Sequence, residues 1–162
     1  MSHVKDFGAV GDGKADDTAE LQHAINDGER RVVIPHGTYR ITKPLVVDLE
    51  KVGFTGISGD GGTAKIVMDG PGPALRMVGT HQGTADPPSF KPNVWGSQRM
   101  PTVSGLEIVG NHPEAIGIQL ERTMQATLTG VLIRKCKYGI HLITRNRNTL
   151  ISHCHIYDGA GK

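Results

Sequence analysis

The segment VSGLEI (residues 103–108) recurs as LTGVLI (residues 128–133) and again as ISHCHI (residues 151–156), at offsets of 25 and then 23 residues. A second word, GIQL (residues 117–120), recurs as GIHL (residues 139–142) after 22 residues. Each word alternates in polarity, which is typical of a short β-strand. A near-constant period with more than one strand per period indicates a solenoid, in which each coil buries its inner face against the next.

The alternation indicates which side chains point into the solenoid. Ile108, Ile133 and Ile156 hold one position of the repeat, and Ile118 and Ile140 hold another, so we expect each set to stack in the interior. The positions between them should face outward: Glu107, Leu132, His155, Gln119 and His141. The sequence therefore predicts an all-β fold, a parallel β-helix with an interior of stacked like residues.

The composition fits a solenoid and excludes several classes of protein. Apolar residues make up 37% of the 162 residues and 22 are glycine, as a thin core and many turns require. A net charge of +2 is too small to indicate a nucleic-acid partner. No apolar run is long enough to cross a membrane, and no signal peptide is visible at the start. Cys136 and Cys154 are not a whole period apart, and we expect free thiols.

A short helix is predicted near the N-terminus. Leu21, Ala24 and Ile25 form one helical face, after the candidate N-caps Asp16 and Asp17, and Gly28 is expected to end the helix. Such a helix is suited to close the open end of a solenoid. The expected organisation is one domain, with the N-terminal cap at residues 4–30, coils at 31–79, a loop insertion at 80–101 and further coils at 102–162.

Two strings resemble the N-terminal signature of the pectate-lyase-like superfamily: VKDFGAVGDGKADDTAELQHAIND (residues 4–27) and VVIPHGTYRI (residues 32–41). The resemblance implies a right-handed parallel β-helix. It does not fix the reaction, because members include rhamnogalacturonases, polygalacturonase-like hydrolases, alginate epimerase modules and phage tailspike depolymerases.

The resemblance leaves two functions open. One is a carbohydrate-active protein that acts on an acidic polysaccharide as a lyase, glycoside hydrolase or epimerase. The other is a non-catalytic glycan-binding or structural β-helix, such as a phage tailspike or a surface adhesion module. It also implies an extracellular or virion-associated location, and a homotrimer if the protein is tailspike-like.

Residues 80–101 interrupt the strand pattern with four prolines and the single tryptophan, Trp95. Long segments of this kind are usually functional or disordered. We expect Trp95 and Phe90 either to stack on a sugar ring or to fold back against the solenoid. At the other end a new coil is due at Gly161, where the chain stops at Lys162 without a cap, so we expect the N-terminal portion of a longer protein.

The active groove of the superfamily resembles a shallow trough beside the strand that follows the Val-x-Ile word. The catalytic candidates at those positions are Asp158, Lys135, Lys137, His155 and Tyr157. The substrate-binding candidates are Trp95, Arg134, Glu114 and His112. Hydrolysis would need two carboxylates about 5 to 10 Å apart, for which Asp158 and Glu114 are available. Proton abstraction beside a uronate carboxylate would need a base and a cation, for which the Lys, His and Tyr candidates are suited.

The chain also departs from the superfamily. The Asn-x-Asp, Asp-Asp and Gly-His-Gly words of the hydrolases and the Asp-Pro-His-Glu word of the epimerases are absent. We therefore expect residues 1–162 alone to be inactive, even if the whole protein is an enzyme. Asp158-Gly159 is also typical of a turn. His153 and His155 could chelate a metal from one strand face, but no third ligand is evident, and we expect no metal or other cofactor. Calcium would enter only for a lyase-type reaction, and no ligand set for it is visible.

Overall fold

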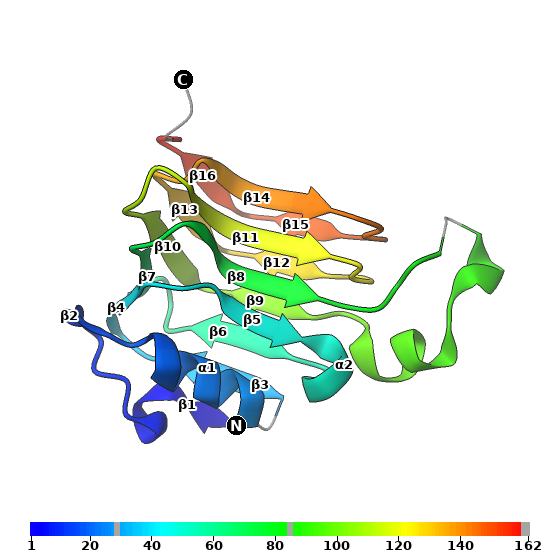
Figure 1. Cartoon of the computed structure of the whole chain (residues 1–162), viewed down its shortest axis with the longest axis horizontal. Helices are drawn as coiled ribbons and strands as arrows, with labels where there is room; N and C mark the ends of the chain where they lie inside the picture. Colours follow the sequence, from blue (N-terminus) through cyan, green and yellow to red (C-terminus); the bar gives the residue numbers. More distant parts are fainter. Residues whose placement is uncertain (28–29, 84–85, 160–162) are drawn as a thin grey trace.

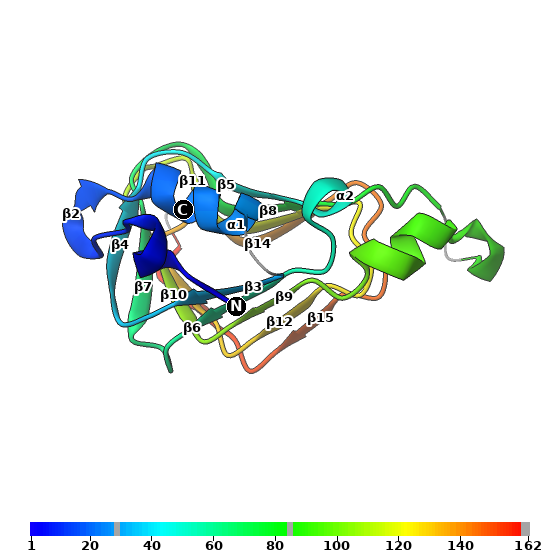
Figure 2. The same ribbon diagram turned by 90° about the horizontal axis from the view of Figure 1, so that it is seen from below.

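A computed structural model describes residues 1–27, 30–83 and 86–159, which form a parallel β-helix (Figure 1). Each complete coil contributes one strand to each of three sheets in turn, which we call sheets A, B and C. Figure 2 shows the three sheets as three sides of the solenoid. The predicted fold is confirmed.

Every strand pairing that joins neighbouring coils is parallel among the described residues. Sheet A consists of β1 (Ser2–His3), β3 (Arg31–Ile34), β6 (Gly56–Gly59), β9 (Thr102–Ser104), β12 (Thr127–Thr129) and β15 (Leu150–Ser152). Sheet B consists of β2 (Asp12–Asp16), β4 (Gly37–Ile41), β7 (Ala64–Met68), β10 (Leu106–Gly110), β13 (Leu132–Arg134) and β16 (His155–Tyr157). Sheet C consists of β5 (Leu45–Asp48), β8 (Gly72–Val78), β11 (Ala115–Glu121) and β14 (Tyr138–Ile143).

The inner residues stack as the repeat predicts. Ile108 pairs with Ile133, and Ile133 pairs with Ile156. In sheet C, Ile118 pairs with Ile140. Ile108 and Ile133 are completely buried, whereas Ile156 is 51% exposed, because β16 is the last strand of its sheet and no described residue lies beyond it. Burial at this position therefore depends on having a coil on both sides.

Helix α1 (Thr18–Asp27) closes the N-terminal end of the solenoid (Figure 1). Its apolar face is buried, and the Gln22 side chain hydrogen-bonds to both the N–H and the C=O of Val46, at 2.8 and 2.9 Å. This contact satisfies an edge that β5 would otherwise leave unpaired. Asp16 accepts from the Thr18 N–H as an N-cap would, but the buried Asp17 carboxylate instead accepts from the N–H groups of Val10 and Gly11.

The remaining helical segments are single turns: η1 (Val4–Phe7), α2 (Leu49–Val52), η2 (Pro87–Ser89) and η3 (Val94–Gln98). Within the described ranges, no helix has the length and apolar character needed to cross a membrane. The expectations for Gly28 as the helix stop, and for Gly161 and Lys162 as the start of a new coil, lie outside the described residues.

The chain leaves the solenoid between β8 and β9, and we call residues 79–101 the excursion. Figure 2 shows it reaching out from the side where sheets C and A meet. The Arg147 guanidinium lies 3.9 Å from the ring centre of Phe90 and donates to the carbonyl of Asp86 at 3.1 Å. The buried His81 ring lies 5.7 Å from the Phe90 ring. Phe90 thus folds back toward the solenoid, whereas Trp95 remains 47% exposed.

Replacing Ile133 by Ala should destabilise the fold strongly, because the side chain is completely buried between two coils. We expect a loss of about 2–5 kcal/mol in the free energy of unfolding, measured by urea denaturation. Ile156→Ala is the matched control at the same repeat position, and it should cost clearly less because Ile156 is half exposed. Equal losses in the two variants would contradict burial by stacking.

Acid should loosen the excursion through His81. Burial and the charges of Arg147 and Arg145 hold the pKa of His81 below its ordinary value. Because the folded-state pKa is lower than the unfolded-state value of about 6.5, the contribution of neutral His81 to stability is complete above that pH. It is lost as the pH falls toward the folded-state pKa. Hydrogen exchange in the excursion should therefore accelerate on acidification in the wild type. A His81→Gln variant that still showed this acceleration would contradict the assignment.

Candidate functional site

Most of the predicted site residues lie where sheet B passes into sheet C. Lys135 and Lys137 lie between β13 and β14, Glu114 lies between β10 and β11, and Asp158 follows β16. The Lys135 N–H donates to the Asp158 carbonyl at 2.9 Å, so these residues occupy neighbouring coils. The parallel stacking therefore brings these candidates to one corner of the solenoid.

Lys137 and Glu114 are paired with each other. The Lys137 ammonium lies 2.7 Å from Oε2 of Glu114, and this contact raises the pKa of Lys137. Lys137 is therefore held in its charged form and is poorly suited to act as a base. The Nδ1 atom of His112 accepts a hydrogen bond from the Glu114 N–H at 3.0 Å, so this atom is engaged within its own coil.

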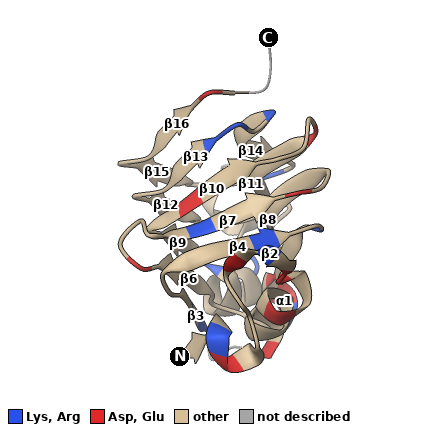
Figure 3. Ribbon diagram, turned by 90° about the vertical axis from the view of Figure 1, so that its left-hand side faces the viewer, with Lys and Arg blue, Asp and Glu red and all other residues tan. Residues whose placement is uncertain are grey.

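A second chain of charges crosses the outer face of sheet B. Nε of Arg134 donates to Oε1 of Glu107 at 2.8 Å, and the Lys65 ammonium lies 3.5 Å from the other oxygen of Glu107. Figure 3 shows these basic and acidic segments on β7, β10 and β13. Glu107, followed by the charges of Tyr157 and Asp158, raises the pKa of Arg134. Arg134 and Tyr157 are register partners on adjacent strands.

These elements surround a depression of about 320 Å³, which we call the corner pocket. Its polar lining consists of Arg134, Lys137, Tyr138 and Tyr157. Its aliphatic lining includes Ile133, Ile140 and Ile156, which are inner residues of the last described coils. Among the described residues that line it, none is acidic. Two cations beside two half-exposed tyrosines can bind an anionic group and pack against a ring.

The other catalytic candidates are exposed. Lys135 is exposed and has no ion-pair partner among the described residues. Asp158 adopts a left-handed turn conformation with φ of 53°, in agreement with a turn role. His155 lies on β16, but His153 has φ of 54° at the corner between sheets A and B, so the two do not share a strand face. No group of three or more His, Cys, Asp or Glu side chains suited to a metal occurs within the described ranges.

Trp95 lies apart from this corner. It belongs to η3 in the excursion, which leaves the solenoid where sheet C passes into sheet A (Figure 2). Its ring lies 6.0 Å from the Phe90 ring, with the Arg99 guanidinium 4.8 Å from its centre. The structure therefore does not bring Trp95 together with the other substrate-binding candidates.

Sequence reasoning missed the charge network on sheet B, since Lys65 was not singled out and Glu107 was expected only to face outward, yet Glu107 joins Lys65 and Arg134. Tyr138, which the superfamily pattern places at a groove position, lines the corner pocket. A usable signal was present, because the word AKIVM (residues 64–68) pairs in register with LEIVG (residues 106–110). Aligning these words would have placed Lys65 beside Glu107.

Comparison with known proteins identifies polysaccharide-related relatives over part of the chain. It is 35% identical over 82 residues to a probable glucan endo-1,3-beta-glucosidase of Arthroderma benhamiae, covering 43% of this chain and 9% of that protein. It is 50% identical over 44 residues to the mannuronan C5-epimerase AlgE3 of Azotobacter vinelandii, covering 25% of this chain and 2% of that protein. The chain thus spans less than a tenth of the length of either relative.

Among solved structures, ORF18 of Geobacillus virus E2 has a TM-score of 0.69 at 17% identity. The match covers 98% of this chain and 37% of that chain, and it shows the shared β-helix fold. The model of one family matches residues 1–98, more than half of the sequence. The chain is therefore a member of the rhamnogalacturonase A/epimerase, pectate lyase-like family.

Proposed function

We propose that this chain is part of a protein that acts on an acidic polysaccharide, and that the corner pocket binds a uronate unit of that polymer. The observation that carries the proposal is the lining of the pocket, where Arg134, Lys137, Tyr138 and Tyr157 converge without an acidic lining residue. Guanidinium and ammonium groups donate strong hydrogen bonds to carboxylates, and aromatic rings pack against the flat face of a sugar. The mannuronan epimerase and glucanase relatives support a polysaccharide as the ligand.

Among the reaction types, proton abstraction beside a carboxylate suits the corner best. Arg134 contacts Glu107 through Nε, and its other N–H groups would bind the uronate carboxylate. Its register partner Tyr157, with His155 on the same strand, would supply a base. Hydrolysis would require Asp158 together with Glu114, but Glu114 is already held by Lys137 at 2.7 Å.

Non-catalytic glycan binding is the second candidate. Lys137 and Arg134 are each neutralised by a glutamate, so both are held in place as binding groups. Tyr157 and Asp158 are exposed, and catalytic groups are usually held more firmly by their surroundings. A protein that only binds a glycan does not require these residues to transfer protons.

Purified residues 1–162 should bind oligogalacturonate without cleaving it. Calorimetric titration with a galacturonate hexamer should show binding that Arg134→Ala weakens at least about tenfold, because a charge-assisted hydrogen bond contributes about 1.5–3 kcal/mol. Lys91→Ala removes an exposed charge on the excursion and is the matched control.

Release of unsaturated uronates, followed by ultraviolet absorbance, should stay at background. Release that Tyr157→Phe abolishes would show that the corner is catalytic by itself and would contradict the binding-only expectation. Binding of the hexamer that was unaffected by Arg134→Ala would contradict the assignment of the corner pocket.

A further inference from the structure

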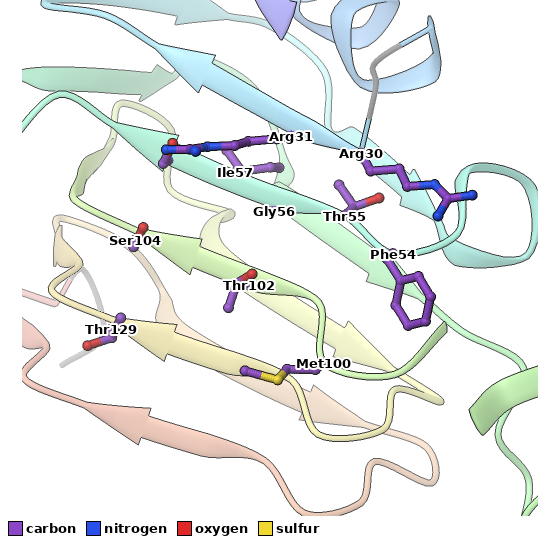
Figure 4. A pocket seen from close by; sticks show the side chains of 11 residues that line it. Arg30, Arg31, Phe54, Thr55, Gly56, Ile57, Met100, Thr102, Ser104 and Thr129 are labelled. Atoms are coloured by element: carbon purple, nitrogen blue, oxygen red, sulfur yellow. The ribbon is translucent and has the colours of Figure 1, made fainter. Parts of the chain in front are cut away.

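The outer face of sheet A carries a groove of about 420 Å³ (Figure 4). The corner pocket lies elsewhere, where sheet B passes into sheet C. Its floor crosses β6, β9 and β12, where Ser58, Ser104 and Thr129 are register partners on successive strands. Thr102 lies beside this row, and Phe54 and Met100 form one wall at the N-terminal ends of the strands. We call this feature the sheet A groove.

The groove continues into the base of the excursion. A second hollow of about 540 Å³ is lined by Trp95, Arg99 and Gln125, and it shares Phe54 and Met100 with the first. The single tryptophan of the chain therefore lines a hollow that adjoins the sheet A groove at Phe54 and Met100. Its side chain is 47% exposed, so part of the indole remains available for a ligand.

Both hollows are lined by basic side chains and by no described acidic side chain. Arg30 and Arg31 border the first part and Arg99 the second, and none of the described lining residues is Asp or Glu. In the part of the chain that the structure describes, none of the three guanidinium groups has a carboxylate partner. Arg30 lies 6.0 Å from the Phe54 ring centre and Arg99 lies 4.8 Å from the Trp95 ring centre. These contacts hold Arg30 and Arg99 beside the aromatic wall and use the faces of the guanidinium groups, not their N–H groups.

The floor of the sheet A groove is hollowed at Gly56. A Cβ atom there would lie 3.3 Å from Oγ1 of Thr102, so the missing side chain leaves the Thr102 hydroxyl accessible. No side-chain hydrogen bond joins Thr102, Ser58 or Ser104 to another described residue, whereas the Thr129 hydroxyl accepts from Ser152 at 3.3 Å. Hydroxyl groups about 4.8 Å apart on successive strands can pair with the hydroxyls of a bound sugar.

We propose that the sheet A groove is a second glycan site, which binds an anionic oligosaccharide by Arg–carboxylate contacts, stacking on Trp95 and hydrogen bonds to the strand hydroxyls. The choice of an acidic glycan rests on charge complementarity at this groove, and the proposed function contributes only the general class of ligand. The sheet A groove and the corner pocket occupy different sides of the solenoid, so each can be tested while the other is intact.

The fluorescence of Trp95 provides a direct test, because no other tryptophan contributes to the signal. Titration of residues 1–162 with a galacturonate hexamer should change this fluorescence in a saturable and salt-sensitive way, whereas a maltose-type glucose hexamer should not. Arg31→Ala and Arg99→Ala should each weaken the fluorescence-detected affinity at least about fivefold, and together at least about tenfold. Lys91→Ala, an exposed charge on the same excursion outside the groove, should leave it unchanged.

Gly56→Val tests the floor without altering charge, and it should block the fluorescence change by filling the hollow over Thr102. Circular dichroism and the urea midpoint should show that this variant is folded, and Arg31→Ala provides an independent variant if it is not.

The proposal is overturned if the arginine variants bind the galacturonate hexamer as tightly as the wild type does. It is also overturned if the neutral glucose hexamer, or an oligothymidylate of equal charge, binds as tightly as the galacturonate hexamer. Loss of one calorimetric binding phase in Arg134→Ala, with an intact Trp95 response, would support both sites. Unchanged calorimetric binding in Arg134→Ala, with an intact Trp95 response, would reject the corner pocket and leave the sheet A groove standing. Loss of the Trp95 response in the sheet A variants is required for the sheet A groove.

Discussion

A coil of this solenoid has no complete core of its own, and its inner side chains are buried only by the coils on either side. Ile133 and Ile156 occupy the same repeat position, yet one is completely buried and the other is 51% exposed. Parallel pairing in register is therefore the constraint on which the structure depends, since a slip of one residue would turn each inner side chain to the outer face. The cap helix α1 serves the same constraint at the other end, where Gln22 satisfies the backbone of Val46.

The same register also orders the outside of the molecule. Residues that share a repeat position lie on neighbouring strands, so outward charges of adjacent coils meet at the strand spacing. Like charges would repel there, and opposite charges do meet: Lys65, Glu107 and Arg134 form one connected set on sheet B. The paired charges at the corner are thus a consequence of stacking as well as a candidate binding surface.

The repeat in the sequence was sufficient to predict the inner residues, because apolar side chains recur there at a period that is visible without alignment. Ile108, Ile118 and their partners stack as expected. The corner conformations were not predictable in the same way, since Lys135 and Asp158 adopt left-handed backbone angles that non-glycine residues seldom take. Those angles, more than residue type, set where the corner side chains lie.

The sequence repeat could not predict the path of the excursion. It has no internal period, and its path is held by Arg147, a residue from a later coil, against Phe90 and Asp86. Long-range contacts of this kind leave no local signal in the sequence. For the same reason Trp95 could be recognised from the sequence as a candidate for sugar stacking, but its position could not be predicted. The structure places it near sheet A and away from Arg134.

The two candidate surfaces differ in how their charges are balanced, and the register explains the difference. At the corner, Lys137 and Arg134 each lie next to a glutamate of the preceding coil. On sheet A the register partner of Arg31 is Gly56, followed by Thr102 and Thr127, so none of its described register partners is acidic. A guanidinium without an ion pair on a sheet surface keeps an uncompensated positive charge, and this charge can attract an anionic ligand. The corner is therefore already stabilised by its own ion pairs, whereas the arginines on sheet A have no carboxylate partner among the residues that the structure describes.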